Sequence, residues 1–541
     1  MLRIQNFVVP FDDETPLVEL AAARLRLPAK EIAAVHVRRK ALDARRYHGA
    51  PISFVYVLSV RLVGGARAEK KWLARFSHDK QVTREVEKPR EPLPKAPLAA
   101  GEKRPVVVGF GPAGMFAALT LARAGRTPLV LERGLDVDAR RAAIEEFWRD
   151  GVLSPHANVQ FGEGGAGTFS DGKLTTRIDD PHTRDVLEAF VAAGAPKEIL
   201  YLHKPHIGTD LLRGIVKRIR EQIQAFGGEV RFGAQVTGLE EKGGTLMALM
   251  VNGEERVPTD TAFFGIGHSA RDTYALLYEK GLHLEAKPFA MGVRIEHPQE
   301  LINLLQYGAD ADNPRLPVAD YALTFRDRET GRGAYSFCMC PGGRVVAAAS
   351  ETGRLVTNGM SDYARDSGVS NAALLVQVGP EDYAPFGSGA LAGIAFQRHY
   401  EELAFRAGGG DYCAPVETVG DFLAGKSGSR DFLLPPTYQP GVRPADLRTC
   451  LPPVVSATLA HALPYFGRRM AGFDGADVPL TGIESRSSAP CRIRREKESF
   501  VAEGMAGLYP IGEGAGYAGG IMSAAVDGMK AALAYLKALT E

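Results

Sequence analysis

The clearest chemistry in this sequence lies in a glycine-rich turn between an apolar strand and a helix. Residues 105–114 have the sequence PVVVGFGPAG, residues 113–123 are typical of a helix, and Gly125 is placed to end it. Gly109 permits a tight turn, Gly111 lets the backbone approach a pyrophosphate, and Gly114 lets the helix pack on the strand. The helix start offers free N–H groups and a positive dipole end to phosphates.

A second apolar strand, 128–131, ends at Glu132. This carboxylate follows the glycines at the separation expected for a group that accepts hydrogen bonds from ribose hydroxyls. Strand, glycines, helix, strand and acid together predict a dinucleotide-binding unit. A glycine-rich turn without a ligand is the alternative, and the motif's context argues against it.

Two further glycine clusters follow this unit. Residues 161–174 (FGEGGAGTFSDGKL) allow close backbone approach to a flat or phosphorylated ligand, and Thr168 and Ser170 add hydroxyl donors; a mobile surface loop is the alternative. Residues 512–521 (GEGAGYAGGI) precede a helix predicted over 522–539, and here the alternative is a tight turn before a core helix. Glu513 is placed to hold a ribityl or ribose hydroxyl. The helix start is expected to face the pyrimidine end of a flavin, where negative charge develops on reduction.

The composition sets bounds on the class of protein. The chain has 541 residues, 45% of them hydrophobic and 24% charged, and its net charge is +1. This length predicts two or three domains, and the balanced charge predicts neither a nucleic-acid nor a membrane surface. The N-terminus has no signal-peptide pattern, and five cysteines without framework spacing fit a reducing compartment, so we predict a cytoplasmic protein without a metal site.

The chain divides into segments by composition and by motif. An amphipathic helix is predicted over 209–226, capped by Thr209 or Asp210 and ended by Gly227 and Gly228, and a β meander follows it. The stretch around Phe337 is expected to form a hairpin that turns at 341–343. We predict a small N-terminal α+β domain (1–85), a linker (86–103), the first part of a nucleotide-binding domain (104–284), an inserted substrate domain (285–485) and the C-terminal part of the nucleotide-binding domain (486–541).

Five motifs in this order resemble the uncharacterised bacterial FAD-dependent dehydrogenases, flavoproteins of the glutathione-reductase-like class with a single dinucleotide-binding domain. The motifs are VVVGFGPAG, FGEGGAGTFSDGKL, GIGHSARDTY, SFCMCPGG and LYPIGEGAGYAGGIMSAAVDG. The resemblance covers about residues 100–541. It implies an α/β fold, with a Rossmann-like three-layer FAD-binding domain, an inserted mixed α+β substrate domain and a small N-terminal α+β domain.

The resemblance also implies non-covalent FAD and a set of residues that bind it. The ADP half is expected to meet Gly109, Gly111, Pro112, Ala113, Gly114 and Glu132. The ribityl and flavin part is expected nearer Gly165, Gly167, Gly512, Glu513, Gly520 and Ile521, with Val236 offering its backbone to adenine. Arg133, Ser170 and Gly267 complete the predicted cofactor-binding set. The Gly-Glu pair at 512–513 departs from the Gly-Asp of many relatives in the wider class.

No second Rossmann unit is visible for a nicotinamide cofactor. The one other glycine pattern, 387–393, follows DYAPF instead of an apolar strand, and its third glycine is one position late, so we expect a loop there. NADH or NADPH would therefore bind transiently over the flavin, or the reductant is a different molecule.

Several other side chains have both a catalytic and an ordinary interpretation. Cys338 and Cys340 are our catalytic candidates, as redox thiols or a nucleophile, and buried core cysteines are the alternative. His156 precedes the second cluster, where some flavoproteins carry covalent flavin, and an ordinary polar residue is the alternative. His268 either contacts the cofactor or orders a loop. Four arginines before the third cluster either bind an anionic substrate or form a solvated basic face: Arg486, Arg492, Arg494 and Arg495.

The function that these features favour is an FAD-dependent oxidoreductase that transfers hydride between the flavin and a small-molecule substrate. Two alternatives stay open, a flavin-dependent RNA-modifying protein and a flavin-binding sensor or structural protein without turnover. The sequence predicts no nucleic-acid or membrane partner, and it leaves the substrate, the general acid or base and the oligomeric state undetermined.

Overall fold

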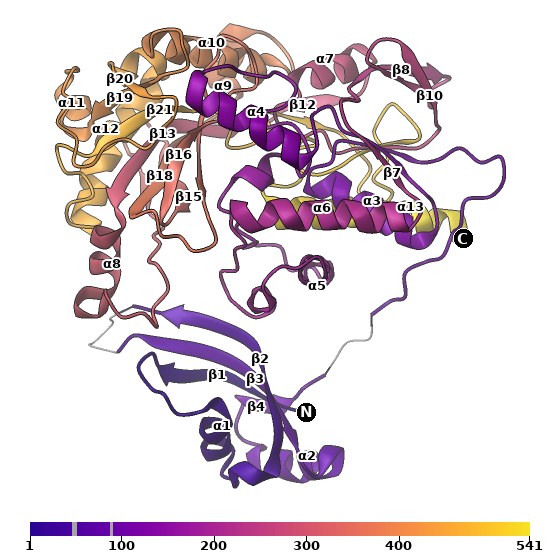
Figure 1. The fold of residues 1–541 in the computed structure, drawn as a ribbon, viewed down its shortest axis with the longest axis vertical. Helices are drawn as coiled ribbons and strands as arrows, with labels where there is room; N and C mark the ends of the chain where they lie inside the picture. Colours follow the sequence, from indigo (N-terminus) through magenta and orange to yellow (C-terminus); the bar gives the residue numbers. More distant parts are fainter. Residues whose placement is uncertain (46–50, 87–89) are drawn as a thin grey trace.

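The computed structural model describes residues 1–45, 51–86 and 90–541 and places them in three connected units (Figure 1). Residues 87–89 of the predicted linker lie outside the described residues. Within the described ranges, no helix is both long and apolar enough to cross a bilayer.

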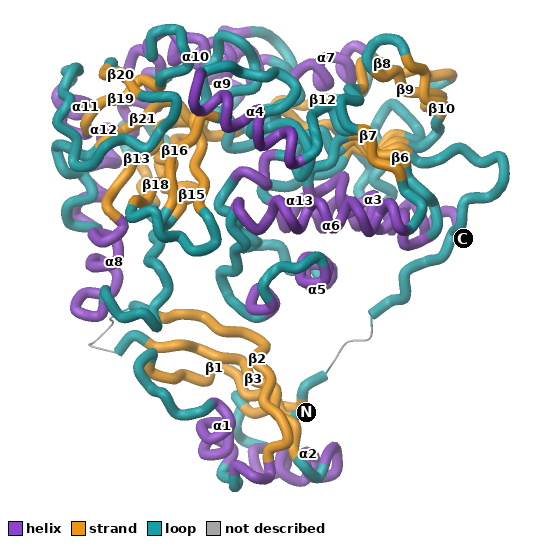
Figure 2. The backbone as a smooth tube through the Cα atoms, in the orientation of Figure 1, coloured by secondary structure: helices purple, strands orange, loops and turns teal. Residues whose placement is uncertain are grey.

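The N-terminal unit is a four-stranded antiparallel sheet with helices on one side. The strand order is β2-β3-β1-β4, and the chain order βαββαβ makes it a ferredoxin-like unit. Alternate residues such as Ile4, Leu58 and Val60 are fully buried on the core face. The sheet lies between its helices and the rest of the molecule (Figures 1 and 2). Its elements are β1 (Leu2–Pro10), α1 (Leu17–Leu25), β2 (Ile32–Asp43), β3 (Ser53–Leu62), α2 (Gly65–Leu73) and β4 (Val82–Arg84).

The second unit is built on a five-stranded parallel sheet of order β23-β11-β5-β6-β7. Its central strands are short and wholly apolar, because both faces of the sheet are covered there. The strands are β5 (Val106–Val108), β6 (Leu129–Leu131), β7 (Glu229–Arg231), β11 (Ala262–Phe264) and β23 (Leu508–Pro510). Strand β23 comes from the far end of the sequence, so the sheet is complete only when both parts of the chain are present.

Different layers cover the two faces of this sheet. Val107, Val130 and Phe263 pack against the helices α3 (Pro112–Ala124), α5 (His182–Ala192), α6 (Thr209–Ala225) and α13 (Ile521–Thr540). Val106 and Val108, which point the other way, pack against the antiparallel meander β8 (Val236–Lys242), β9 (Thr245–Val251) and β10 (Glu255–Pro258). The result is a three-layer, Rossmann-like domain, with α4 (Val137–Asp150) and α7 (Arg271–Glu279) at its border with the third unit.

The third unit is a seven-stranded mixed sheet inserted between α7 and β23. Its order is β14-β15-β18-β13-β21-β19-β20, and its central strand β13 is buried along almost its whole length. The strands are β13 (Phe289–Pro298), β14 (Thr324–Arg326), β15 (Gly333–Cys340), β18 (Val369–Val378), β19 (Ala414–Thr418), β20 (Val442–Pro444) and β21 (Pro479–Glu484). The helices are α8 (Gln299–Tyr307), α9 (Pro380–Tyr383), α10 (Ala392–Ala407), α11 (Val419–Ala424) and α12 (Pro453–Arg469).

The chain enters and leaves this unit side by side. The antiparallel pair of β12 (Leu284–Ala286) and β22 (Cys491–Ile493) ties the two crossings together.

Two local predictions were wrong. The turn at 341–343 does not close a hairpin, because β15 pairs with β14 and β18, whereas β16 (Gly343–Ala347) pairs with β17 (Thr357–Ser361). Helix α6 has Gly208 at its N-cap, since Thr209 donates to the carbonyl of Thr168 and Asp210 accepts from the N–H of Tyr363. In both places a partner distant in sequence replaced the local one.

Candidate functional site

A cavity of about 360 Å³ opens at the carboxyl edge of the parallel sheet, beside the inserted unit. This volume is within the range of small-molecule and cofactor sites. Ligands bind at this edge in parallel α/β sheets, because the loops there turn away from the strands and expose helix starts. The walls come from all three glycine clusters, from the loop after β11 and from β15 of the inserted unit.

Glycine is required where the clusters meet. A Cβ on Gly165 would lie 2.8 Å from the Cα of Gly111, so these two loops touch backbone to backbone. Gly109 has a φ of +89°, and a Cβ there would lie 2.5 Å from the carbonyl oxygen of Gly265. The first two clusters therefore form one continuous backbone surface, which can approach a ligand closely.

The predicted cofactor-binding residues converge on this cavity. Two of them lie behind its wall: a Cβ on Gly114 would lie 1.9 Å from the oxygen of Gly109, and one on Gly512 would lie 2.6 Å from the Cβ of Ala113. Both glycines therefore permit packing and do not line the cavity. The others line it: Gly109, Gly111, Pro112, Ala113, Glu132, Arg133, Gly165, Gly167, Ser170, Val236, Gly267, Glu513, Gly520 and Ile521.

Glu132 has a structural task as well as a place in the wall. Its buried carboxylate accepts the N–H groups of Phe110 at 2.7 Å, Gly134 at 2.8 Å and Gly162 at 3.0 Å. Three charge-assisted bonds fix the first and second clusters to each other. The sequence predicted a ribose-binding acid here and did not anticipate this clamp.

Glu513 is the opposite case, because its carboxylate lacks a donor within the described part of the chain. It lines the cavity, and none of the described residues makes a hydrogen bond or ion pair with its side-chain oxygens. Burial raises the pKa of Glu513 to about 7, which the charge of Lys287 only partly offsets. Leaving a desolvated carboxylate without a donor is costly. The site thus fits a cofactor that brings hydroxyl groups to this point, as the ribityl chain of FAD does.

The starts of two helices face the same cavity. Helix α3 begins with Gly111 at its N-cap and Pro112 in its first turn, and α13 begins with Gly520 at its N-cap. No described side chain caps either start, so N–H groups of both first turns are left to a ligand. Such ends favour anions, which suits a pyrophosphate at α3 and a reduced flavin ring at α13.

The end of the cavity near the inserted unit is polar and carries a thiol. Cys338 lines it, together with Lys173, Asn358 and Glu484, whereas Cys340 is buried behind the wall. Sequence reasoning missed Lys173, Asn358 and Glu484 as members of this wall. For Lys173 a signal existed, since it lies in the second glycine cluster; for the other two there was no local signal.

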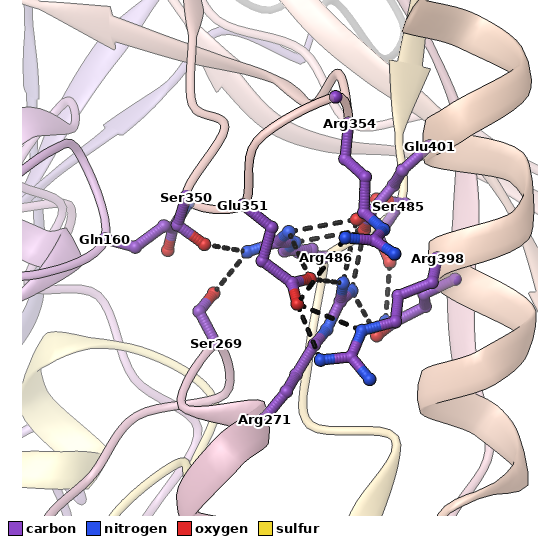
Figure 3. Close-up of polar contacts among 12 residues, drawn as sticks. Gln160, Ser269, Arg271, Ser350, Glu351, Arg354, Arg398, Glu401, Ser485 and Arg486 are labelled. Carbon is purple, nitrogen blue, oxygen red and sulfur yellow. Dashed lines mark hydrogen bonds and ion pairs between the residues drawn. The ribbon is translucent and has the colours of Figure 1, made fainter. Parts of the chain in front are cut away.

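A buried ionic network joins the nucleotide-binding and inserted units next to the cavity (Figure 3). Glu401 of α10 is fully buried, and its carboxylate accepts from Arg271 at 2.7 and 2.8 Å and from Arg486 at 2.9 and 3.0 Å. Glu351 bonds to Arg271 and to Arg398, and Arg486 donates to Ser269 at 3.1 Å. Arg486 and Ser269 also line the cavity, so this network fixes part of its wall.

Of the two histidines and four arginines considered in the sequence, His268 and Arg486 line the cavity. His268 lines the cavity, and burial with the charges of Arg486 and Arg271 lowers its pKa to about 3, so it is neutral at physiological pH. His156 is exposed and lies outside the cavity wall. The structure does not gather the four arginines at one anion site: Arg486 pairs with Glu401, Arg492 with Glu285, Arg494 with Glu285 and Glu503, and Arg495 with Asp527.

Comparisons with known proteins narrow the family to which the chain belongs. The family model described as "FAD-dependent protein, C-terminal domain-like" matches residues 288–487, and "Domain of unknown function (DUF8436)" matches residues 1–61. A Clostridium beijerinckii protein, called an uncharacterized protein, is 48% identical over 532 residues, which are 98% of each chain.

Solved structures are more distant. A mutant of the halogenase PltM in complex with FAD has a TM-score of 0.40 and 10% identity, over 81% of this chain and 70% of its own. L-proline dehydrogenase from P. horikoshii has a TM-score of 0.33 and 11% identity, over 82% and 95%. Similarity at this level does not identify a reaction.

The parallel sheet, the three glycine clusters and the cavity between them define the class, a flavoprotein with a single dinucleotide-binding domain. Within that class the chain belongs to the family of FAD-dependent proteins that its motifs resemble, together with its Clostridium beijerinckii relative.

Proposed function

We propose that this protein is an FAD-dependent oxidoreductase that transfers hydride between the flavin and a small organic substrate. The observation that carries the proposal is the convergence of three glycine clusters, at residues 109–114, 161–174 and 512–521, on one cavity that also holds the carboxylate of Glu513, to which none of the described residues donates. Structural turns alone do not account for this convergence.

The residues present divide the work of holding FAD in the proposed complex. Val236 and Arg133, which line the cavity, would meet the adenine, and the backbone of Gly111 to Ala113 with the start of α3 would face the pyrophosphate. Glu513 would accept hydrogen bonds from hydroxyls of the ribityl chain. The start of α13 would stabilise negative charge on the pyrimidine side of the ring.

FAD supplies the hydride chemistry when it is bound, and the protein supplies position and electrostatics. The inserted unit closes the cavity at the end where Cys338 and Lys173 lie, so it is the part that selects the substrate. The buried network around Glu401 holds Arg486, which lines the cavity, in place.

The test is an anaerobic visible spectrum of the purified protein during addition of NADH and then NADPH. The proposal expects a flavin spectrum and rapid bleaching by a pyridine nucleotide or by an organic substrate from a dehydrogenase panel. A protein that binds no flavin after FAD is supplied would contradict it. A bound flavin that every reductant bleaches only slowly would instead support the sensor alternative. A salt-dependent shift of RNA in a gel would support the RNA-modifying alternative.

A further inference from the structure

Two cysteines meet at the end of the cavity that the inserted unit closes. Cys338 is half-buried and lines the cavity. Cys340 is buried, and its thiol donates to the carbonyl oxygen of Cys338 at 3.2 Å. Cys338 therefore faces a molecule in the cavity, and the thiol of Cys340 lies against its backbone.

The backbone between them departs from a regular strand. β15 changes its register with β18 between Phe337 and Cys340, and Cys338 has a φ of +41°. Residues two apart in a regular strand lie roughly 6.6 Å apart, close to the upper limit for a disulfide. A bulge bends the strand and brings such residues closer. A non-glycine residue in this backbone region is strained, and such strain concentrates at functional sites.

A lysine from the nucleotide-binding unit fixes this turn. Lys173 donates its Nζ to the carbonyl oxygen of Met339, between the two cysteines, and pairs with Asp171 at 3.2 Å. From the other side, the buried Arg294 donates to the carbonyl oxygen of Cys338 at 3.0 Å. The second glycine loop thus contacts the backbone that joins the two thiols.

The charges around the pair make its two sulfurs unequal. Hydrogen bonding between the two thiol side chains, with the positive charges of Lys173 and Arg294, holds the pKa of Cys338 well below its usual range. The same hydrogen bonding between the thiols, together with burial, raises the pKa of Cys340. Asp171 and Glu484 are the acidic groups facing this cluster, and each is bonded to an arginine, Arg365 and Arg294 respectively.

We propose that Cys338 and Cys340 form a second redox centre, a dithiol that exchanges two electrons with the FAD held in the same cavity. The inference rests on the proposed function. In the oxidising direction a sulfur–sulfur bond forms between the two residues, and the S–H bond of Cys340 breaks. Cys338 enters as thiolate and Cys340 as thiol; the flavin takes up two electrons and that one proton, and it becomes the reduced anion. Atoms and charge balance without another reactant.

The position of the pair also indicates a substrate class. Cys338 is the sulfur that a second molecule can reach, so its disulfide exchanges with thiols, and its thiolate attacks disulfides. Cys340 then serves as the resolving thiol. The substrate class is a thiol or disulfide small enough to enter the cavity beside Phe337.

The test is an anaerobic reductive titration of the holoprotein with dithionite, counted per bound FAD. FAD alone takes two electrons, and FAD with an oxidised dithiol takes four. We expect four for the wild type and for Cys413→Ser, which removes a half-buried cysteine elsewhere, and two for Cys338→Ser with Cys340→Ser. Two electrons in the wild type, with FAD bound, would overturn the dithiol and leave the oxidoreductase intact. Failure to bind FAD would overturn the proposed function instead.

A second measurement does not depend on flavin turnover or on a folded double variant. The rate of iodoacetamide alkylation is followed against pH by peptide mapping, with Cys413 as the internal reference. The midpoint for Cys338 should lie below that for Cys413, because the thiolate is the reacting form and the pKa of Cys338 is lowered whereas that of Cys413 is raised. Lys173→Met should move it upward. Equal midpoints in the wild type would overturn the inference.

Discussion

Replacing Glu401 by glutamine tests whether the buried ionic network holds the two units together. The substitution keeps the shape of the side chain but removes a charge that Arg271 and Arg486 share, both of them buried. Ser485 also donates to Glu401 at 2.7 Å. Burial raises the pKa of Glu401, but the charges and hydrogen bonds of Arg271 and Arg486 outweigh it and hold the pKa below its usual range.

The size of the effect follows from this geometry. After Glu401→Gln, Glu351 is the one carboxylate among the described residues left to face both buried guanidinium groups, and it already bonds to Arg398. Removing one partner of a buried pair costs about 3–5 kcal/mol, because a buried charge is left uncompensated. For a unit of roughly 200 residues each kcal/mol lowers the melting temperature by about 2–4 °C, so we expect a fall of about 6–20 °C.

The assay is thermal unfolding at pH 7, with Glu402→Gln as the matched control. Glu402 is the next residue on α10, and its ion pair with Arg406 is exposed. An exposed pair contributes less than about 1 kcal/mol, so the control should melt close to the wild type. Equal melting temperatures for Glu401→Gln and Glu402→Gln would refute the reasoning, since the network would then contribute no more than surface charge.

Three further substitutions test the cofactor site and the inserted unit. Gly114→Ala places a Cβ 1.9 Å from the oxygen of Gly109 and should abolish FAD binding. The control Gly214→Ala in α6, where the nearest atom to the new Cβ is 3.6 Å away, should still bind FAD. Equal flavin absorbance in the two purified variants would contradict the close packing at Gly114. Glu513→Gln should weaken FAD binding by about 10- to 150-fold, because a hydrogen bond to a charged acceptor contributes about 1.5–3 kcal/mol. Unchanged affinity in a fluorescence titration of the apoprotein with FAD would show that Glu513 does not bind the cofactor. Burial raises the pKa of Glu417 to about 8, so the folded state binds the proton of this carboxyl more tightly than the unfolded chain does. The wild type should therefore lose stability relative to Glu417→Gln as pH rises from about 4.5 to 8. Denaturant unfolding at both pH values measures this, and a constant difference in unfolding free energy between the two proteins would disprove the effect.

The parts of the site that depend on local sequence were predictable. The glycine clusters, the helices that follow them and Glu513 each combine a motif with its required neighbours, and the structure brings them to one cavity. The three-layer fold was predicted from the resemblance to the FAD-dependent family, and the five-stranded parallel sheet with layers on both faces confirms it.

The remainder depended on contacts between distant segments. Nothing near Lys173 in the sequence indicates that its amine reaches Met339, and nothing near Glu401 indicates that it neutralises Arg271 and Arg486. The predicted hairpin at 341–343 was wrong for the same reason, since β15 and β16 each found a partner elsewhere. An alternating pattern identifies a strand but does not identify its neighbour.

The most direct test of the account is a crystal structure of the protein with FAD. The account predicts the adenine beside Val236, the pyrophosphate on the backbone of Gly111 to Ala113, a ribityl hydroxyl bonded to Glu513, and the flavin ring between the start of α13 and Cys338. Density for FAD outside this cavity, or with the adenine at the Cys338 end, would contradict it.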